Sequence, residues 1–586
     1  MSNEKKVRMD RFACTIMIVG KEASTDGSVI ISHTDDGLTD GRVIYVPARK
    51  WDLSLPDENK RPVYYDNASL GSNLTYNSTD IRRYIGNYRG PGYQTQSEGY
   101  AESRPIGYID QVAETYAYFD SSYGIMNEHN LMISECTCGA KVHPEPDKKR
   151  LFYSAELSRV ALERCQTAPE ALKLIAELIR DYGFYGTGET LLIGDHNEAW
   201  VMEMCGYDAD GSNGIWVAQR VPDNHYFIAA NEFRIRDIYM SDEEKNMTAA
   251  QRKKAETQGL PYYVSNDKEN TVLYSKNLFS ICKEKGWIDP TATQLDWLPT
   301  VSYGEYSHPY YSLRRVWRGF SKAAPLSHLS PKVEDGYTRN YPFSLQPDKK
   351  LSVADIAAIY RDEYEGTEFD LTVGPAAGPF ANPVRYYVNP DHGNTWNLNT
   401  YTPQGAWERP ISVYNCGFLW INQAKKVKDE VIGISWIGLD RPLANCLMPF
   451  YTKMPELPKS MQIMNLLEFE FKGPSAFWAF NFVANYVNLN YAYMMKDLAH
   501  VQNEWESKAF KRINEVLATG NTKGLVNFCT RHVKDVLAAW WDLATRLIVQ
   551  YNDGALTTGP NSVMEKIDYP RKWLREVGYY DGPTKY

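Results

Sequence analysis

The sequence predicts an α+β fold, in which antiparallel strands and helices occupy separate segments of the chain. Three observations predict it. Short apolar runs joined by turns rich in Gly, Ser, Asp and Asn are typical of β-hairpins. Between two such strand groups, apolar residues recur at helical spacing, and the chain ends in long helical stretches. With 586 residues, of which 43% are hydrophobic, the chain has enough apolar side chains for a large core.

The first strand unit begins at Cys14. In the stretch CTIMIVGKEASTDGSVIISHTDDG, apolar runs at Cys14 to Val19 and Ser28 to Ser32 flank a turn rich in Gly, Ser and Asp. This pattern predicts a β-hairpin. The region that follows, about 54–104, is polar and rich in Tyr, Asn, Gly and Pro. It predicts a surface insertion, able to line a pocket, rather than a separate core.

A helical pair comes next, in the stretch SAELSRVALERCQTAPEALKLIAELIRDYG. Apolar residues recur there every three to four positions, which predicts two amphipathic helices. Thr167 and Glu170 fit a capping box that starts the second helix, and Gly183 is placed to end it.

Further strands follow the helical pair. ETLLIGDHNEAWVMEMCG predicts a hairpin whose turn is Asp195 to Asn197, and GIWVAQRVPDNHYFIAANEF continues it with two more strands around Val221 to Asn224. We expect all of these strands in one antiparallel sheet. From about Asn503 the chain changes to long helices, so we predict a core over 14–502 and a helical subdomain over 503–586.

Composition limits the function. A net charge of −9 and a pI of about 5.7 give no basic surface for nucleic acid or anionic lipid. No apolar run is long enough to span a membrane, and the N-terminal MSNEKKVRMDRFA has no apolar segment of a secretory signal. Nine Cys, odd in number and irregularly spaced, suit a reducing compartment. We therefore predict a cytoplasmic protein whose partners are small molecules or peptides.

The sequence lacks the common cofactor-binding motifs. The sequence has neither a phosphate-binding Gly-Lys-Ser/Thr loop nor a His pair at zinc-binding spacing. GFYGTGET, at Gly183 to Thr190, follows a helix and precedes a strand, the reverse of a dinucleotide fingerprint. The two thiols of CTC, at Cys136 to Cys138, are too few for a metal without other ligands. We expect no metal and no cofactor.

Cys14 is the candidate nucleophile. If the bond before it were cut, one residue would carry a thiol and an α-amine, and an amine with a pKa of about 8 can accept the thiol proton near neutral pH. The alternative is a buried, inert cysteine at the start of a strand. Position alone favours that alternative.

Several stretches, however, resemble the cysteine dipeptidases of peptidase family sixty-nine, which are N-terminal nucleophile hydrolases related to penicillin V acylase and bile salt hydrolase. Besides ACTIMIVGKEASTDGSVIISHTDDG, the similar stretches occur in the expected order and cover most of the chain: GIMNEHNLMIS, GETLLIGDHNEAWVMEMCG, VAQRVPDNHYFIAANEFRI, YSLRRVWRGF, FDLTVGPAAGPFANPVRY and ISWIGLDRPLANCLMPFY.

The resemblance implies a four-layer αββα sandwich with surface insertions. It implies that a leader, residues 1–13, is removed by self-cleavage to expose Cys14. It further implies hydrolysis of dipeptides or small peptides through an acyl-enzyme on Cys14, without a cofactor, by a homo-oligomer.

The resemblance also implies roles for polar residues. Asp36 is similar to the acid that holds the nucleophile's α-amine, and Asp35 fills that role if the turn shifts by one residue. Asn231 is similar to an asparagine near the oxyanion and the amine. Thr137 falls where related hydrolases carry a second oxyanion asparagine, so the identity of that donor stays open.

Three further positions complete the predicted site. Arg314 or Arg315 matches an arginine close to the thiol. His33 stands where relatives often carry arginine and is a candidate substrate contact.

Each assigned residue also has a structural alternative. The two aspartates could form a turn, and His33 could be a packed histidine at a strand end. Asn231 could cap a helix that follows it. Of the two arginines, one could be solvated and the other ion-paired.

Two other functions compete with a dipeptidase. The same machinery could hydrolyse N-acyl amides, or the chain could be a non-catalytic scaffold that keeps its leader. A carboxylate that faces a substrate amine would favour dipeptides, and Glu128, Glu135 and Asp66 are the candidates for it.

Overall fold

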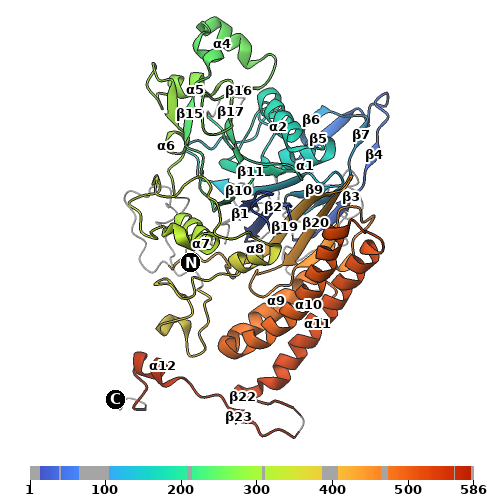
Figure 1. Cartoon of the computed structure of the whole chain (residues 1–586), viewed down its shortest axis with the longest axis vertical. Helices are drawn as coiled ribbons and strands as arrows, with labels where there is room; N and C mark the ends of the chain where they lie inside the picture. The colour runs from blue at the N-terminus through green and yellow to red at the C-terminus, as the bar shows by residue number, and fades with distance from the viewer. Residues whose placement is uncertain are drawn as a thin grey trace, which may run out of the picture.

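The structure is a computed structural model that describes residues 14–37, 41–64, 105–207, 214–305, 310–385, 407–463, 471, 473–559 and 561–582. Two antiparallel sheets with helices on their outer faces dominate it (Figure 1). The predicted α+β class is confirmed.

The smaller sheet has six strands and contains the first hairpin. Its strands, in spatial order, are β14 (Tyr226–Ala229), β1 (Thr15–Val19), β2 (Val29–Asp36), β19 (Cys416–Val427), β20 (Glu430–Leu439) and β21 (Met448–Tyr451). β1 pairs antiparallel with β2, with Ile16 opposite His33. The predicted hairpin is therefore confirmed, and β1 lies inside the sheet between β14 and β2.

The larger sheet has nine strands. Their spatial order is β16 (Tyr262–Val264), β17 (Val272–Ser275), β13 (Ile215–Val221), β12 (Ala199–Cys205), β11 (Gly188–Gly194), β10 (Met132–Cys138), β9 (Gly124–Asn127), β8 (Tyr118–Asp120) and β3 (Ile44–Val46). Short two-stranded ribbons lie outside it: β4 (Arg49–Lys50) with β7 (Glu114–Thr115), β5 (Lys60–Tyr64) with β6 (Pro105–Asp110), β15 (Asp237–Tyr239) with β18 (Gln294–Asp296), and β22 (Ala555–Leu556) with β23 (Glu565–Lys566).

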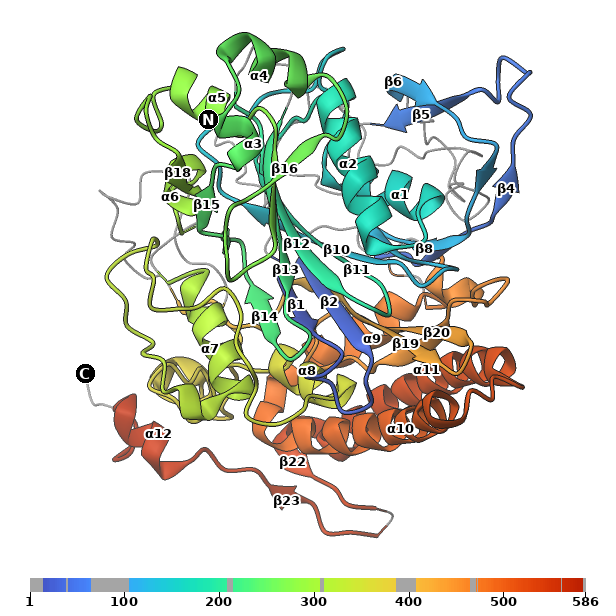
Figure 2. The same cartoon turned by 45° about the horizontal axis from the view of Figure 1, so that its top comes forward.

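Helices cover the outer faces of both sheets. α1 (Ser154–Arg164) and α2 (Ala168–Tyr182) pack on the nine-stranded sheet. On the six-stranded side lie α7 (Leu313–Ala323), α8 (Val353–Tyr360), α9 (Ala476–Val487), α10 (Tyr491–Thr519) and α11 (Leu525–Gln550). Figure 2 shows the same arrangement from a second direction. The shorter helices are α3 (Asp242–Lys245), α4 (Ala249–Glu256), α5 (Leu278–Glu284), α6 (Trp297–Val301) and α12 (Arg571–Glu576).

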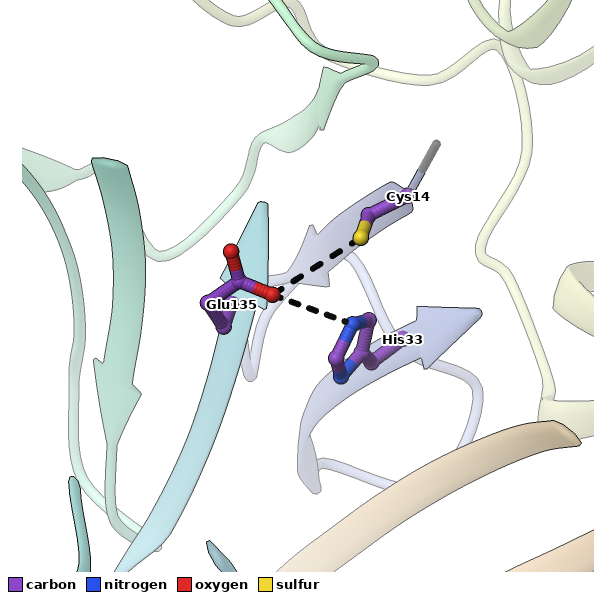
Figure 3. A group of neighbouring side chains, drawn as sticks. All are labelled: Cys14, His33 and Glu135. Carbon is purple, nitrogen blue, oxygen red and sulfur yellow. Dashed lines mark hydrogen bonds and ion pairs between the residues drawn. The ribbon is translucent and has the colours of Figure 1, made fainter. Parts of the chain in front are cut away.

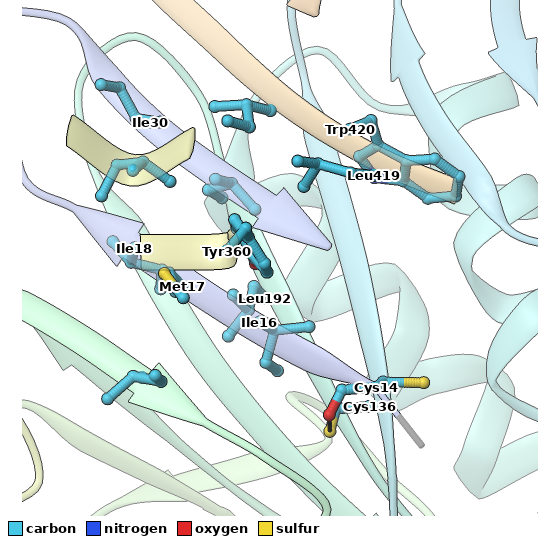
Figure 4. Packing of buried hydrophobic residues seen from close by; sticks show 14 of the residues in the cluster. Cys14, Ile16, Met17, Ile18, Ile30, Cys136, Leu192, Tyr360, Leu419 and Trp420 are labelled. Atoms are coloured by element: carbon cyan, nitrogen blue, oxygen red, sulfur yellow. Dashed lines mark hydrogen bonds between the residues drawn. The ribbon is translucent and has the colours of Figure 1, made fainter. Parts of the chain in front are cut away.

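The alternation of side chains along a strand explains why the two sheets stack. Leu191 and Ile193 of β11 pack with the residues of α1 and α2, whereas Leu192 between them packs in the cluster that contains β1 and β2. Successive side chains of a strand point to opposite faces, so a strand that is apolar at every position is covered on both sides. Figure 4 shows Leu192 with Ile16 and Ile18 in this cluster.

The predicted helical pair is confirmed in detail. Thr167 accepts from the backbone N–H of Glu170, and the Glu170 side chain accepts from the backbone of Thr167, so both bonds of the capping box are present. Gly183 ends the helix with a φ of 73°, in the region that favours glycine. The hairpin of β11 and β12 is confirmed as well.

The prediction that all of these strands share one sheet is wrong for β14. β13 continues the nine-stranded sheet next to β12, but β14 leaves it and pairs with β1 in the other sheet. The turn between them, around Pro222 and Asp223, docks on the end of β1: the Asp223 carbonyl accepts from the N–H groups of Glu22 and Ala23. These bonds satisfy the backbone of the turn at the point where the chain crosses between sheets.

Two boundary predictions stay predictions. Most of the insertion at 54–104 lies outside the described residues, apart from the stretch up to Tyr64 that ends in β5. The boundary between 502 and 503 falls inside α10, which runs unbroken from Tyr491 to Thr519.

All nine cysteines are buried and none forms a disulfide. Among the helices in the described part of the chain, none combines the length and apolar character needed to cross a bilayer.

Candidate active site

Cys14 lies directly before β1, fully buried where the two sheets meet. Its sulfur is 3.6 Å from Asp35 Oδ1 on β2 and 3.7 Å from Glu135 Oε2 on β10. β2 belongs to the six-stranded sheet and β10 to the nine-stranded one, so both sheets contribute to the surroundings of the thiol. Figure 3 shows the Cys14 and Glu135 side chains pointing toward one another, with His33 beside them.

Arg315 of α7 binds the backbone of the same residue. Its Nη1 donates to the Cys14 carbonyl at 2.8 Å and to Thr15 Oγ1 at 3.1 Å. Its Nη2 donates to the Asn231 side-chain oxygen at 2.8 Å. One fully buried guanidinium thus joins the start of β1 to Asn231, two residues after the end of β14.

Arg314, the neighbouring arginine, points elsewhere. Its Nε is 3.2 Å from Glu408 Oε2, and its guanidinium lies 3.5 Å from the centre of the Phe369 ring. Adjacent residues of an α-helix are rotated by about 100° about its axis, so the two arginines cannot face the same group. Of the pair left open by the sequence, Arg315 is the one beside Cys14.

Asn231 connects three parts of the site. Its backbone N–H donates to Cys136 Sγ at 3.0 Å, and its side-chain amide donates to the Thr137 carbonyl at 2.8 Å. Its φ of 62° is in the left-handed region, which asparagine enters more readily than most residues. Residues 232–236 are not helical, so the alternative of a helix cap at Asn231 is wrong.

The side chains of Asp35 and Asp36 point to opposite faces of the sheet, as those of successive strand residues do. Asp35 is the carboxyl beside the thiol, whereas Asp36 forms an ion pair with Arg409. Both are buried within β2, so neither forms a surface turn. The structure brings Asp35 to the Cys14 sulfur, while the role that the resemblance gives to Asp36 concerns the α-amine of a trimmed chain and stays a prediction.

Thr137 and His33 both contact Glu135. Thr137 donates its hydroxyl to Glu135 Oε1 at 3.0 Å, and its carbonyl accepts from Asn231. His33 Nε2 lies 3.7 Å from Glu135 Oε2. The His33 ring is enclosed by Tyr123, Phe418 and Trp420.

Electrostatics favour the neutral forms of Cys14, Asp35 and His33. Burial raises the pKa of the Cys14 thiol well above its ordinary value, and the hydrogen bond with Cys136 and the charges of Glu135 and Asp35 raise it further. Burial and the Glu135 charge raise the pKa of Asp35. Burial lowers the pKa of His33 to about 3, so its imidazole is neutral at physiological pH. In the untrimmed chain, these surroundings therefore favour the protonated thiol of Cys14 over the thiolate.

Glu135 and Cys136 show where the sequence reasoning was incomplete. Glu135 was one of three candidates for a substrate amine, and it is the one at the thiol. Glu128 accepts from the Ala117 backbone instead, and Asp66 lies outside the described residues. Cys136 donates to the Cys14 carbonyl at 3.5 Å, a contact between distant strands that CTC alone could not indicate.

Three side chains of the site are of the types that bind metal ions. One ligand atom from each of Cys14, His33 and Glu135 lies within 4.8 Å of the others. The expectation of no metal rested on motif spacing, which cannot reveal this group because Cys14 precedes β1, His33 lies in β2 and Glu135 lies in β10.

Comparison with known proteins gives a consistent result. The sequence profile described as peptidase family C69 matches residues 13–88 and 120–504. A probable dipeptidase from Latilactobacillus sakei is 22% identical over 582 residues, which is 95% of this chain and 99% of that protein.

Two further relatives agree with it. A probable dipeptidase from Salmonella dublin is 24% identical over 75% of this chain and 81% of its own length. Dipeptidase A from Lactobacillus helveticus is 22% identical over 91% of this chain and 92% of its own length.

Proposed function

The chain belongs to peptidase family C69, and we propose that it is a self-processing cysteine dipeptidase whose nucleophile is Cys14. The observation that carries this proposal is the position of Cys14: it is buried at the start of an interior strand, its carbonyl is bound by Arg315, and carboxyls of both sheets lie within 3.7 Å of its sulfur. The layer order described above supports an N-terminal nucleophile hydrolase sandwich.

The first step is removal of the leader. The Cys14 sulfur attacks the carbonyl carbon of Ala13, the Ala13 to Cys14 amide bond breaks, and the thiol proton passes to the released nitrogen. Water then hydrolyses the resulting thioester and frees residues 1–13. Cys14 keeps its thiol and gains an α-amine.

The second step is hydrolysis of a dipeptide. The α-amine takes the thiol proton, and the sulfur attacks the substrate carbonyl. The proton passes to the leaving amine, and water hydrolyses the acyl-enzyme. The gain of an amine matters here, because the buried thiol of the untrimmed chain has a raised pKa.

Arg315 and Asn231 have complementary roles in this scheme. Arg315 fixes the Cys14 backbone at 2.8 Å and brings positive charge to the site, which favours a thiolate. Asn231 orients Arg315. The family resemblance implies that Asn231 also stabilises the oxyanion. In that role its side-chain amide would turn from the Thr137 carbonyl to the substrate oxygen. One such donor contributes about 2.7 to 4 kcal/mol of transition-state stabilisation.

Glu135 favours dipeptides over N-acyl amides. The α-amine of a dipeptide is two bonds from the carbonyl carbon that the sulfur attacks. A carboxyl 3.7 Å from that sulfur is therefore within reach of the substrate's ammonium group. An N-acylated substrate has no charge at that position and gains nothing from Glu135.

The test begins with the mass and N-terminal sequence of purified protein. We expect a chain that starts at Cys14 and hydrolyses free dipeptides in preference to their N-acetylated forms. Cys14→Ala is expected to keep residues 1–13 and to lose turnover, whereas Cys165→Ala, at a buried cysteine outside the site, keeps both properties.

Each alternative has its own outcome. An untrimmed, inactive wild type would support the scaffold function, and preference for the acetylated substrate would support an acylase. The cytoplasmic location and the homo-oligomer stay predictions from the sequence and the resemblance.

A further inference from the structure

We propose that Cys14, His33 and Glu135 form a binding site for one Zn²⁺ ion, which blocks the thiol when it is bound. Their Sγ, imidazole nitrogen and carboxylate oxygen converge within 4.8 Å (Figure 3). Sulfur, imidazole and carboxylate are the three donor types that Zn²⁺ takes in proteins.

The distances suit tetrahedral zinc. With ordinary bond lengths of about 2.3 Å to sulfur and about 2.1 Å to nitrogen and oxygen, tetrahedral ligands lie about 3.6 Å (sulfur to oxygen) and about 3.4 Å (nitrogen to oxygen) apart. The corresponding distances here are 3.7 Å from Cys14 Sγ to Glu135 Oε2 and 3.7 Å from His33 Nε2 to Glu135 Oε2. The third pair, Cys14 Sγ and the His33 nitrogen, lies within 4.8 Å, against about 3.6 Å for tetrahedral zinc. Binding therefore requires these two side chains to approach each other by up to about 1 Å, while their distances to Glu135 change by only a few tenths of an ångström.

His33 supplies an independent observation. Its side chain is completely buried, and neither ring nitrogen has a hydrogen-bond partner among the described residues. A buried polar group without a partner is costly, and a native structure retains few of them. Nε2 faces Glu135 Oε2, so a cation between them would give this nitrogen the partner it lacks.

Charge balance points the same way. A thiolate and a carboxylate together neutralise a divalent cation, and a neutral imidazole adds no charge. The assembled site is therefore neutral, whereas separate anions buried at this depth would each be costly. Binding releases the thiol proton to solvent, and the fourth coordination position stays open for water.

The consequence for activity rests on the proposed function. Zinc that holds the Cys14 sulfur and the Glu135 carboxyl occupies both the nucleophile and the group assigned to the substrate amine. Zinc is therefore expected to inhibit leader removal and dipeptide hydrolysis, and a chelator is expected to restore both.

The experiment measures binding without using turnover. The protein as purified is stripped with a chelator, dialysed to equilibrium with Co²⁺, and scanned for thiolate-to-cobalt charge-transfer absorption in the near ultraviolet. Zn²⁺ is then titrated in to displace the cobalt. We expect one cobalt per chain, a charge-transfer band, and complete displacement by one equivalent of Zn²⁺.

Matched variants assign the ligands. Cys14→Ser is expected to lose the band, and His33→Phe and Glu135→Gln to weaken binding at least about 100-fold, more than the loss of a group that only supports a ligand. His532→Phe and Cys165→Ser change a histidine and a cysteine that are also buried but lie outside the site, and both keep wild-type binding. Circular dichroism establishes that each variant is folded, and His33→Gln replaces His33→Phe if the latter is not.

The outcomes separate this inference from the proposed function. Binding of one cobalt through Cys14 by a protein without dipeptidase activity would support the site and overturn the enzyme. Hydrolysis of dipeptides by a folded protein that lacks the charge-transfer band, or whose band survives in Cys14→Ser, would overturn the metal site alone.

Discussion

Two clusters of buried charge lie close to the nine-stranded sheet, and they are built in opposite ways. Beside α1, Arg61 of β5 donates to Glu156 at 2.8 Å and to Glu163 at 2.8 Å. Arg159 of the same helix binds Asp120 at 2.9 Å. Every one of these groups is within hydrogen-bond distance of an opposite charge.

The cluster around Cys14 lacks such pairing. Its sulfur, carboxyls and imidazole approach one another only to 3.6 and 3.7 Å. Within the described residues, Asp35 Oδ2 and both His33 nitrogens have no hydrogen-bond partner. Buried charges with complete partners fix a structure, whereas incompletely satisfied polar groups in a core are typical of functional sites. The comparison predicts that changes beside α1 affect stability and that changes at Cys14 affect chemistry.

The largest effect is expected from Cys14→Ala. Loss of a nucleophile lowers turnover by a factor of about 10⁴ to 10⁶, or about 5 to 8 kcal/mol of transition-state stabilisation. The free energy of unfolding changes little, because the thiol has no strong partner. Dipeptide hydrolysis and urea unfolding of the same preparation check both halves, and a large loss of stability would break the comparison.

Arg61→Met is expected to have the opposite profile. It removes the guanidinium that neutralises two buried carboxylates, which costs about 3 to 5 kcal/mol of unfolding free energy. Turnover per folded molecule stays at the wild-type level. Lys60→Met is the control, since Lys60 pairs with Asp110 at the surface, and its urea midpoint is expected to match the wild type.

The sequence predicts local elements of this fold better than contacts between distant segments. The hairpin at Cys14, the capping box at Thr167 and the end of α2 at Gly183 follow from local patterns, so the sequence predicts them correctly. The crossing of β14 to the other sheet could not be predicted, because it depends on contacts between the turn at Pro222 and the end of β1. The same limit applies to the site, where Arg315 and Glu135 reach Cys14 from 301 and 121 residues away.

A pair of variants in α7, Arg315→Met and Arg314→Met, separates an effect on chemistry from an effect on stability within one helix. The first removes the donor to the Cys14 carbonyl and is expected to lower turnover by a factor of about 10² to 10³. The second removes a contact with Glu408 and is expected to leave turnover close to the wild type. Steady-state kinetics with a free dipeptide measures both, and equal losses would mean that the arginines act through the stability of α7.

Asp35→Asn is expected to have a small effect on stability. Burial raises the pKa of Asp35, so the neutral carboxyl is favoured in the folded state. A neutral amide of the same size then changes the free energy of unfolding by less than about 1 kcal/mol. Chemical denaturation near pH 7 gives the value, and a loss comparable to that of Arg61→Met would show that Asp35 carries a paired charge.

The sequence distance between Cys14 and its partners has a consequence for biosynthesis. β1 leaves the ribosome first, but its neighbour β14 ends at Ala229, Arg315 lies in α7, and β2 pairs with β19, which ends at Val427. Contacts of such long range form late in folding. Under the proposed mechanism, the newborn chain carries Cys14 through most of translation before the surrounding groups exist, and loss of the leader would mark a molecule whose assembly is complete.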